Sequence, residues 1–249
     1  MRIIVLRTGD AIPSVAERTG QQFFDFIKGT AGDSWPYDWE CIDVRTSQVS
    51  QVSQVSDVQL PDPRQVKGAF IITGSASSVT ERAPWMLQTE DYIRRIADAE
   101  VPLLGICFGH QLIGQALGGE VAKNPNGREI GTVRLEVSKD DPLLAGQPRS
   151  FDVQTTHSDS VVRLPPGAVV HASTALEPNT VFSVGPHIRG VQHHPEMSDA
   201  IIRGYVEARY DIIKGEGLDP EAILGAIHPA PENGQTLRNF VRNFVLRAS

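Results

Sequence analysis

The residues with the strongest chemical signal surround Cys107, in the segment PLLGICFGHQLIGQALGG of residues 102–119. A run typical of a buried strand leads directly into Gly105 and Cys107, and an amphipathic pattern with helical spacing follows at once. Glycines two positions before and after Cys107 permit a sharp turn that presents the thiol at the carboxyl end of a strand. The adjacent helix N-terminus favours the thiolate, the nucleophilic form. We therefore predict that Cys107 is a nucleophile. An inert core thiol is the alternative, and we assign that role to Cys41, whose surroundings lack these features.

A second segment, GVQHHPE at residues 190–196, offers the base that a cysteine nucleophile needs. His194 and Glu196 lie two residues apart with a proline between them, so the carboxylate can hold one imidazole nitrogen while the other faces the thiol. His193 is an alternative base. A metal site that combines both histidines with His187 is a further alternative, which the lack of zinc-type ligand spacing disfavours.

A third segment, FIITGSASSV at residues 70–79, has a loop of small residues directly after a strand. Backbone N–H groups of such a loop can stabilise an oxyanion, together with the N–H of Phe108, the residue after the proposed nucleophile. An ordinary turn explains the loop equally well when it is taken alone. A flavodoxin-like nucleotide-binding module is a further alternative. The loop does not fit a phosphate-binding role well, because it has one glycine where such loops usually need several.

Four short β-branched runs are typical of strands that position these segments. They cover residues 3–6, 69–73, 102–106 and 188–192. Their hydrophobicity is continuous rather than alternating, which is typical of a parallel sheet covered on both faces. One helical repeat follows Pro84. A second covers residues 112–117, and Gly118 ends it. The sequence thus predicts an α/β fold with an open, mostly parallel sheet and helices on both faces.

From Gly131 to Val184 the pattern changes to short strands joined by proline and glycine turns, which indicates a small antiparallel strand element. The predicted strands there cover residues 132–137, 161–164, 169–172 and 181–184. An amphipathic helix from Leu237 onwards, with Thr236 as its N-cap, closes the chain.

We interpret residues 1–249 as a single domain, a size at which roughly 70% of the unfolded surface is buried on folding. Residues 47–58, SQVSQVSQVSDV, repeat a three-residue unit that fits neither strand nor helix, and we predict a surface loop there. Residues 215–235 are predicted to be an irregular segment before the C-terminal helix.

Composition limits the classes of function. With 40% hydrophobic and 21% charged residues the chain is of globular type. A formal net charge of −7 without a basic stripe argues against a nucleic-acid partner. No apolar run approaches the roughly 20 residues of a membrane span, so no membrane partner is expected. The N-terminus lacks a secretory pattern, from which we expect a cytoplasmic protein with free thiols.

The motifs GICFGHQ, GVQHHPE and TGSASSV, with QTTHSDSVVRLPPGA at residues 154–168, resemble the class I glutamine amidotransferases. The resemblance is greatest to the glutaminase domain of GMP synthetases and their stand-alone relatives, and it extends from about residue 69 to residue 196. It implies a flavodoxin-like sheet and a triad of Cys107 as nucleophile, His194 as base and Glu196 as the partner of that base.

The resemblance also assigns residues that bind substrate. Gln111 and the backbone around His157 and Ser158 match positions that hold glutamine, and His193 occupies a position that is usually aromatic. The positions that match the oxyanion loop are Gly74, Ser75 and Phe108. Much of the family has paired glycines there, so the serine is a departure.

The activity that the resemblance implies is hydrolysis of the γ-amide of L-glutamine through a γ-glutamyl thioester, with no metal and no organic cofactor. Residues 197–249 are too few for an ATP-dependent synthetase domain, so we expect any ammonia acceptor to belong to a separate synthetase subunit. A γ-glutamyl peptide or amide hydrolase that needs no acceptor is the alternative enzyme. A non-catalytic regulatory or binding domain on the same fold is the alternative from another class.

Overall fold

The structure is a computed structural model that describes residues 1–32, 35–46 and 60–246. The predicted surface loop at residues 47–58 lies outside the described residues.

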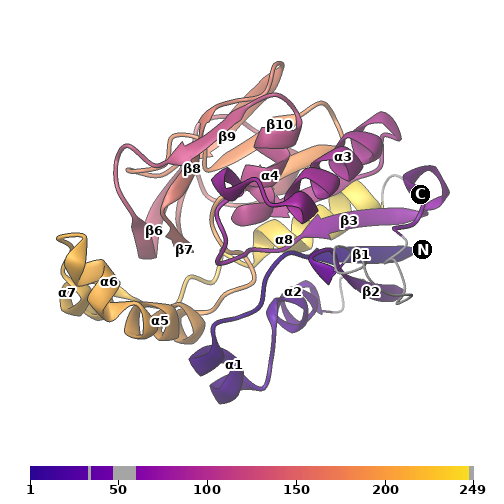
Figure 1. Cartoon of the computed structure of the whole chain (residues 1–249). Helices are drawn as coiled ribbons and strands as arrows, with labels where there is room; N and C mark the ends of the chain where they lie inside the picture. The colour runs from indigo at the N-terminus through magenta and orange to yellow at the C-terminus, as the bar shows by residue number, and fades with distance from the viewer. Residues whose placement is uncertain (33–34, 47–59, 247–249) are drawn as a thin grey trace.

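A nine-stranded sheet forms the centre of the described part of the chain (Figure 1). Five neighbouring strands run parallel, in the order β2 (Asp38–Asp43), β1 (Arg2–Arg7), β3 (Gly68–Ile72), β4 (Leu103–Ile106) and β11 (Ile188–Val191). Four antiparallel strands extend it, in the order β10 (Val181–Val184), β9 (Ala168–Ser173), β6 (Glu129–Val137) and β7 (Ser150–His157). A small antiparallel sheet pairs β5 (Glu120–Lys123) with β8 (Asp159–Arg163).

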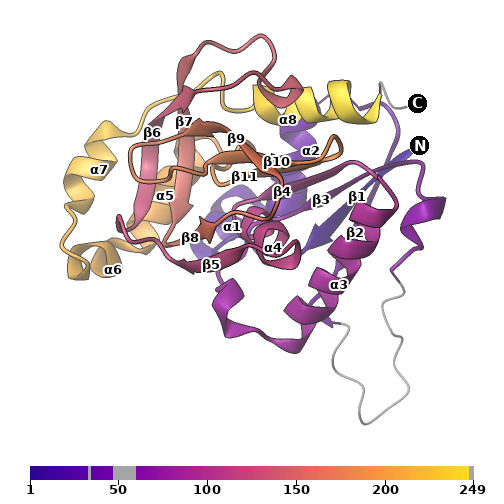
Figure 2. The ribbon, with the colours of Figure 1, turned by 90° about the horizontal axis from the view of Figure 1, so that it is seen from above.

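Both faces of the parallel half are covered, because its strands are apolar on both sides. Alternate residues of β1 divide between two cores: Ile3 and Val5 pack in one cluster, and Ile4 and Leu6 in the other. Helices α2 (Phe23–Ala31) and α8 (Gln235–Phe240) cover the first face, while α3 (Pro84–Asp98) and α4 (Phe108–Ala116) cover the second (Figure 2). The predicted α/β fold is confirmed.

A third group of helices packs beside β6 and β7, away from the parallel half (Figure 2). Its members are α5 (Asp199–Ala208), α6 (Tyr210–Gly215) and α7 (Pro220–Ala226), with α1 (Pro13–Thr19) packed against α5. A separate apolar cluster holds them, which includes Val15 of α1, Ile130 of β6 and Ile202 of α5. None of the helices in the described part of the chain is long and apolar enough to cross a membrane.

Three expectations differ from the structure. The C-terminal helix begins at Gln235 with Gly234 as N-cap, and Thr236 lies inside it, where its hydroxyl accepts a hydrogen bond from Gln147. The segment predicted to be irregular contains α7. Asp219 caps the N-terminus of this helix, where its side chain accepts hydrogen bonds from two backbone N–H groups. Cys41 is exposed on the edge strand β2 rather than buried in the core, because only one face of that strand packs inward.

Candidate functional site

Cys107 occupies a sharp turn between β4 and α4, as the sequence predicts. Its φ of 51° and ψ of −103° are unusual for a residue with a side chain, and it forms the N-cap of α4. The backbone N–H of Cys107 donates to the carbonyl of Val191 at 2.8 Å, which ties the turn to the end of β11. The side chain is 6% exposed and lies at the positive end of the α4 dipole, where a thiolate is favoured.

The flanking glycines permit close backbone contacts. A Cβ atom at Gly105 would lie 2.4 Å from the carbonyl oxygen of Gly109, and one at Gly109 would lie 2.5 Å from the carbonyl oxygen of Ile72. Both contacts are with backbone atoms, which cannot rotate away as a side chain would. The two glycines therefore allow α4 to start directly against β3 and β4.

His194 and Glu196 form a buried hydrogen-bonded pair in the loop after β11. Nδ1 of His194 lies 2.7 Å from Oε1 of Glu196, and neither side chain is more than 3% exposed. Nε2 of His194 is buried and has no hydrogen-bond partner among the described residues. The imidazole thus has one nitrogen held by a carboxylate and the other free to exchange a proton.

Charges around His194 favour its imidazolium form. Burial lowers the pKa of His194, but the negative charges of Glu196 and Cys107 outweigh that effect and raise the pKa to about 10. The influence of Cys107 reflects its proximity to the ring. An imidazolium at His194, held by the carboxylate of Glu196, is therefore favoured.

His193, the alternative base, is placed differently. Its ring is fully buried, neither of its nitrogens has a hydrogen-bond partner in the described part of the chain, and burial lowers its pKa to about 3. The structure therefore joins His194, not His193, to the carboxylate. Among the residues described, no group of three or more His, Cys, Asp or Glu side chains is arranged to hold a metal ion.

The loop after β3 lies against this pair. A Cβ atom at Gly74 would lie 3.0 Å from Cε1 of His194, so a larger residue there would press on the imidazole and displace it by a few tenths of an ångström. The Gly74 carbonyl accepts a hydrogen bond from the hydroxyl of Thr8 at 3.2 Å. Because a trans peptide directs its C=O and N–H oppositely, the N–H of Ser75 points away from Thr8. Phe108, the first residue of α4, adds an N–H without a partner inside the helix.

A cavity of about 150 Å³ adjoins Cys107 and collects most of the other expected residues. Its lining includes Ser75, Phe108, Gln111, His157 and Ser158. The side-chain amide of Gln111 donates to the carbonyl of Asp159 at 2.9 Å, which fixes it against the start of β8. Gly74, His194 and Glu196 are absent from this lining, although Gly74 lies next to the His194 ring.

Several residues that support this arrangement carry no local sequence signal. The side-chain amide of Asn233 donates to the carbonyls of His194 and Met197 at 2.8 and 3.1 Å, which pins the loop after β11. Oε2 of Glu129 lies 3.3 Å from Nε2 of His157 and fixes the orientation of that ring. Phe23 of α2 stacks on the His194 imidazole with 6.2 Å between ring centroids. These contacts join residues far apart in the chain, so spacing does not reveal them.

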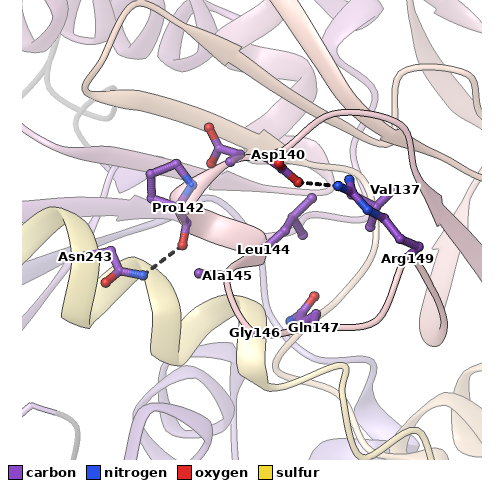
Figure 3. Close-up of a pocket in the computed structure, with 10 residues that line it drawn as sticks. Val137, Asp140, Pro142, Leu144, Ala145, Gly146, Gln147, Arg149 and Asn243 are labelled. Carbon is purple, nitrogen blue, oxygen red and sulfur yellow. Dashed lines mark hydrogen bonds and ion pairs between the residues drawn. The ribbon is translucent and has the colours of Figure 1, made fainter.

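A second cavity, of about 580 Å³, lies between the end of β6, the turn that follows it and the C-terminal helical segment (Figure 3). Arg149 and Asp140 form an ion pair of 2.8 Å at its edge, and the side chain of Asn243 donates to the carbonyl of Pro142. Neither Cys107 nor His194 lines it. The smaller cavity, which Cys107 lines, is therefore the candidate functional site.

The chain is similar in sequence to two kinds of known protein. The chain is 30% identical over 154 residues to gamma-glutamyl peptidase 3 of Arabidopsis thaliana, a match that covers 59% of this chain and 62% of that protein. It is 39% identical over 145 residues to a GMP synthase [glutamine-hydrolyzing] of Thermosipho africanus, a match that covers 55% of this chain and 27% of that protein. The chain thus spans less than two thirds of the length of each of these relatives.

Solved structures share the fold. A glutamine amidotransferase from Thermotoga maritima superposes with a TM-score of 0.71 at 21% identity and covers 98% of both chains. The sequence model of the family described as glutamine amidotransferase class-I matches residues 44–201, which contain the turn at Cys107, the loop after β3 and the His194 loop. With this match over more than half of its length, the chain belongs to the class I glutamine amidotransferase family.

Proposed function

We propose that the protein is a cysteine hydrolase that cleaves the γ-amide of L-glutamine through a γ-glutamyl thioester, with Cys107, His194 and Glu196 as its catalytic triad. The observation that carries the proposal is the buried His194, which lies 2.7 Å from Glu196 at one nitrogen and has its pKa raised by Cys107 as well as by Glu196. A positioned nucleophile, base and orienting carboxylate are the groups that acyl transfer requires.

In the first half of the reaction, the Cys107 thiolate attacks the γ-carboxamide carbon, and the carbonyl π electrons move onto oxygen. Backbone N–H groups of Phe108 and of the loop at Gly74 and Ser75 stabilise this oxyanion. When the tetrahedral intermediate collapses, the C–N bond breaks and the His194 imidazolium donates its proton to the departing nitrogen. Ammonia leaves, and a γ-glutamyl thioester on Cys107 remains.

In the second half, neutral His194 accepts a proton from a water molecule as the water oxygen attacks the thioester carbon. Collapse of this second intermediate breaks the C–S bond and releases glutamate. The sulfur leaves as the thiolate, and His194 is again an imidazolium, so the starting charge state is restored. Glu196 holds the imidazole in the tautomer that serves both halves. Gln111 and the backbone at His157 and Ser158 hold the amino acid part of the substrate.

The ammonia so released would serve a separate synthetase subunit. This part of the proposal is supported by the match to a GMP synthase [glutamine-hydrolyzing], of which this chain spans 27%.

A γ-glutamyl peptide hydrolase is the second candidate, and one observation favours it. The match to a gamma-glutamyl peptidase covers 62% of that protein, so the chain resembles the peptidase over most of its length. The same triad would act, with an amine of the peptide as leaving group in place of ammonia.

Glutamate release from L-glutamine and from γ-glutamyl dipeptides tests both candidates. Cys107→Ala removes the nucleophile, and Cys41→Ala is the matched control, since Cys41 is exposed on β2 and outside the site. We expect release by the wild type and by Cys41→Ala and none by Cys107→Ala. Release from glutamine supports the glutaminase, and faster release from dipeptides than from glutamine supports the peptidase. Release that persists in Cys107→Ala, or silence of the wild type on every substrate, would refute the proposed chemistry.

A further inference from the structure

Two arginines line the cavity beside Cys107, and the family motifs assign neither of them. Arg128 lies in the turn before β6, and Arg209 joins α5 to α6. The family match ends at residue 201, so Arg209 comes from a part of the chain beyond it.

The two guanidinium groups differ in how their charge is balanced. Arg128 forms a two-point ion pair with Glu216 at the end of α6, with N–O distances of 2.6 and 2.9 Å. Arg209 has no ion pair among the described residues, and its Nη1 is buried without a hydrogen-bond partner there. The guanidinium carbon of Arg209 lies 4.9 Å from the centroid of the Tyr205 ring, which orients the group without neutralising it.

The surroundings make this unpaired charge costly. Burial lowers the pKa of Arg209, and the neighbouring charge of Arg128 lowers it further, although Tyr205 and Cys107 oppose the effect. Arg209 as a residue is partly buried, and its Nη1 is a buried cationic donor without a partner, an arrangement whose desolvation is not compensated. An anion that enters the cavity would supply both the missing hydrogen bond and the missing charge.

We propose that Arg209 binds a carboxylate of the substrate and so determines its specificity. This inference rests on the proposed function, which places the reacting carbonyl of a γ-glutamyl compound at Cys107, in the same cavity. Such compounds carry an α-carboxylate, and γ-glutamyl peptides carry a second carboxylate in the leaving group. Guanidinium and carboxylate match in a planar two-point geometry. Arg209 is thus a binding residue that takes no part in proton transfer.

The test compares three variants of the full chain. Arg209→Met keeps the length of the side chain without its charge, and Arg209→Lys restores the charge without the planar fork. Arg203→Met is the matched control, because Arg203 belongs to α5 but does not line the cavity. The substrates are L-glutamine, its α-amide, γ-glutamylglycine and γ-glutamylglycinamide.

For Arg209→Met we expect KM for the substrate whose carboxylate is bound to rise about 10- to 100-fold with little change in kcat, the range for a hydrogen bond to a charged group. Arg209→Lys should recover part of this loss, and Arg203→Met should match the wild type. If the α-carboxylate is bound, KM rises for every substrate that has it, and the wild type discriminates against the α-amide. If the leaving-group carboxylate is bound, KM rises for γ-glutamylglycine alone.

Two results would overturn the inference. One is kinetics of Arg209→Met that match Arg203→Met on every substrate. The other is an equal loss on substrates with and without each carboxylate, which would indicate a structural role. Calorimetric binding of L-glutamate and γ-glutamylglycine to the Cys107→Ala chain separates this test from the proposed function. If the wild type hydrolyses none of the substrates but ligand binding to the Cys107→Ala chain depends on Arg209, only the proposed function is refuted. If the wild type and Arg209→Met hydrolyse every substrate alike, only the inference is refuted.

Discussion

Replacing Glu196 by glutamine tests how much of the proposed chemistry depends on one buried carboxylate. Glutamine has nearly the same shape, so the change removes charge while the packing is kept. The side-chain carbonyl can still accept from Nδ1 of His194, at the 2.7 Å that now separates Nδ1 from Glu196 Oε1. The variant therefore isolates the electrostatic part of the interaction from its geometry.

The size of the effect follows from the pKa of His194. A rise from 6.5 to about 10 corresponds to about 5 kcal/mol in favour of the imidazolium, at about 1.4 kcal/mol for each tenfold change. Glu196 contributes more to this rise than Cys107 does. If the glutamine variant loses about half of the effect, about 2 kcal/mol, kcat/KM falls about 30-fold, at about 1.4 kcal/mol for each tenfold change.

The pH dependence gives a second readout. His194 must be protonated when the leaving nitrogen departs, so kcat/KM of the wild type should fall as pH rises through the pKa of His194, near 10. Without the carboxylate that pKa is lower, and the alkaline limb should move to lower pH. The same sign holds for stability: the folded pKa exceeds the unfolded value of about 6.5, so the contribution of His194 is complete below that pH and is lost as pH rises through about 10.

Glutamate release measured from pH 6 to pH 11 gives both quantities. Glu177→Gln is the control, because Glu177 is also fully buried but lies outside the site, and its rate should stay within about twofold of the wild type. A Glu196→Gln chain with a wild-type rate and an unmoved alkaline limb would show that Glu196 does not tune His194. A rate loss of equal size in Glu177→Gln would point to general damage to the fold.

Two further changes test a close backbone contact and a buried ion pair, each by the midpoint of thermal unfolding. Gly105→Ala places a methyl group 2.4 Å from the backbone of the first turn of α4, so it should lower the free energy of unfolding by about 3 kcal/mol and remove most of the activity. Its control is Gly29→Ala, inside α2 with open space around it, which should raise the free energy of unfolding by up to about 1 kcal/mol; equal effects of the two changes would contradict the packing argument. Asp141 and the buried Arg189 form an ion pair of 2.9 Å, so Asp141→Asn leaves Arg189 without its counter-charge and should lower the free energy of unfolding by about 3 kcal/mol or more. Asp140→Asn, which removes a surface ion pair, should leave the midpoint unchanged. A midpoint that neither change moves would show that the buried pair does not stabilise the fold.

The sequence predicts the parallel half of the fold because its signals are local. A continuous apolar run, two glycines and an amphipathic repeat within residues 102–119 specify the strand, turn and helix around Cys107. The pairing of His194 with Glu196 is equally local, since two residues of chain determine the distance between them. These features can be predicted without information on the tertiary contacts that surround them.

The features that sequence reasoning missed depend on distant contacts. The strand at Ser150–His157 carries mixed polar and apolar residues, and it is a strand because β6 pairs with it along its whole length. Asn233 holds the His194 loop across 39 positions of chain. Arg209 and Arg128 meet at the cavity because α5 packs beside β6. No spacing rule connects such residues.

This contrast assigns the proposed chemistry and the substrate recognition to different parts of the molecule. In an open parallel sheet, the loops at the carboxyl ends of neighbouring strands converge on one edge. The strands β3, β4 and β11 are neighbours, so the loops of Gly74, Cys107 and His194 meet whatever the rest of the chain does. The outer wall of the cavity comes instead from the β7–β8 turn and the joint between α5 and α6. Changes in that wall would alter which γ-glutamyl compound binds and leave the reacting groups in place. Substitution of Arg209 should therefore change the relative rates among substrates, whereas Cys107→Ala should abolish the hydrolysis of all of them.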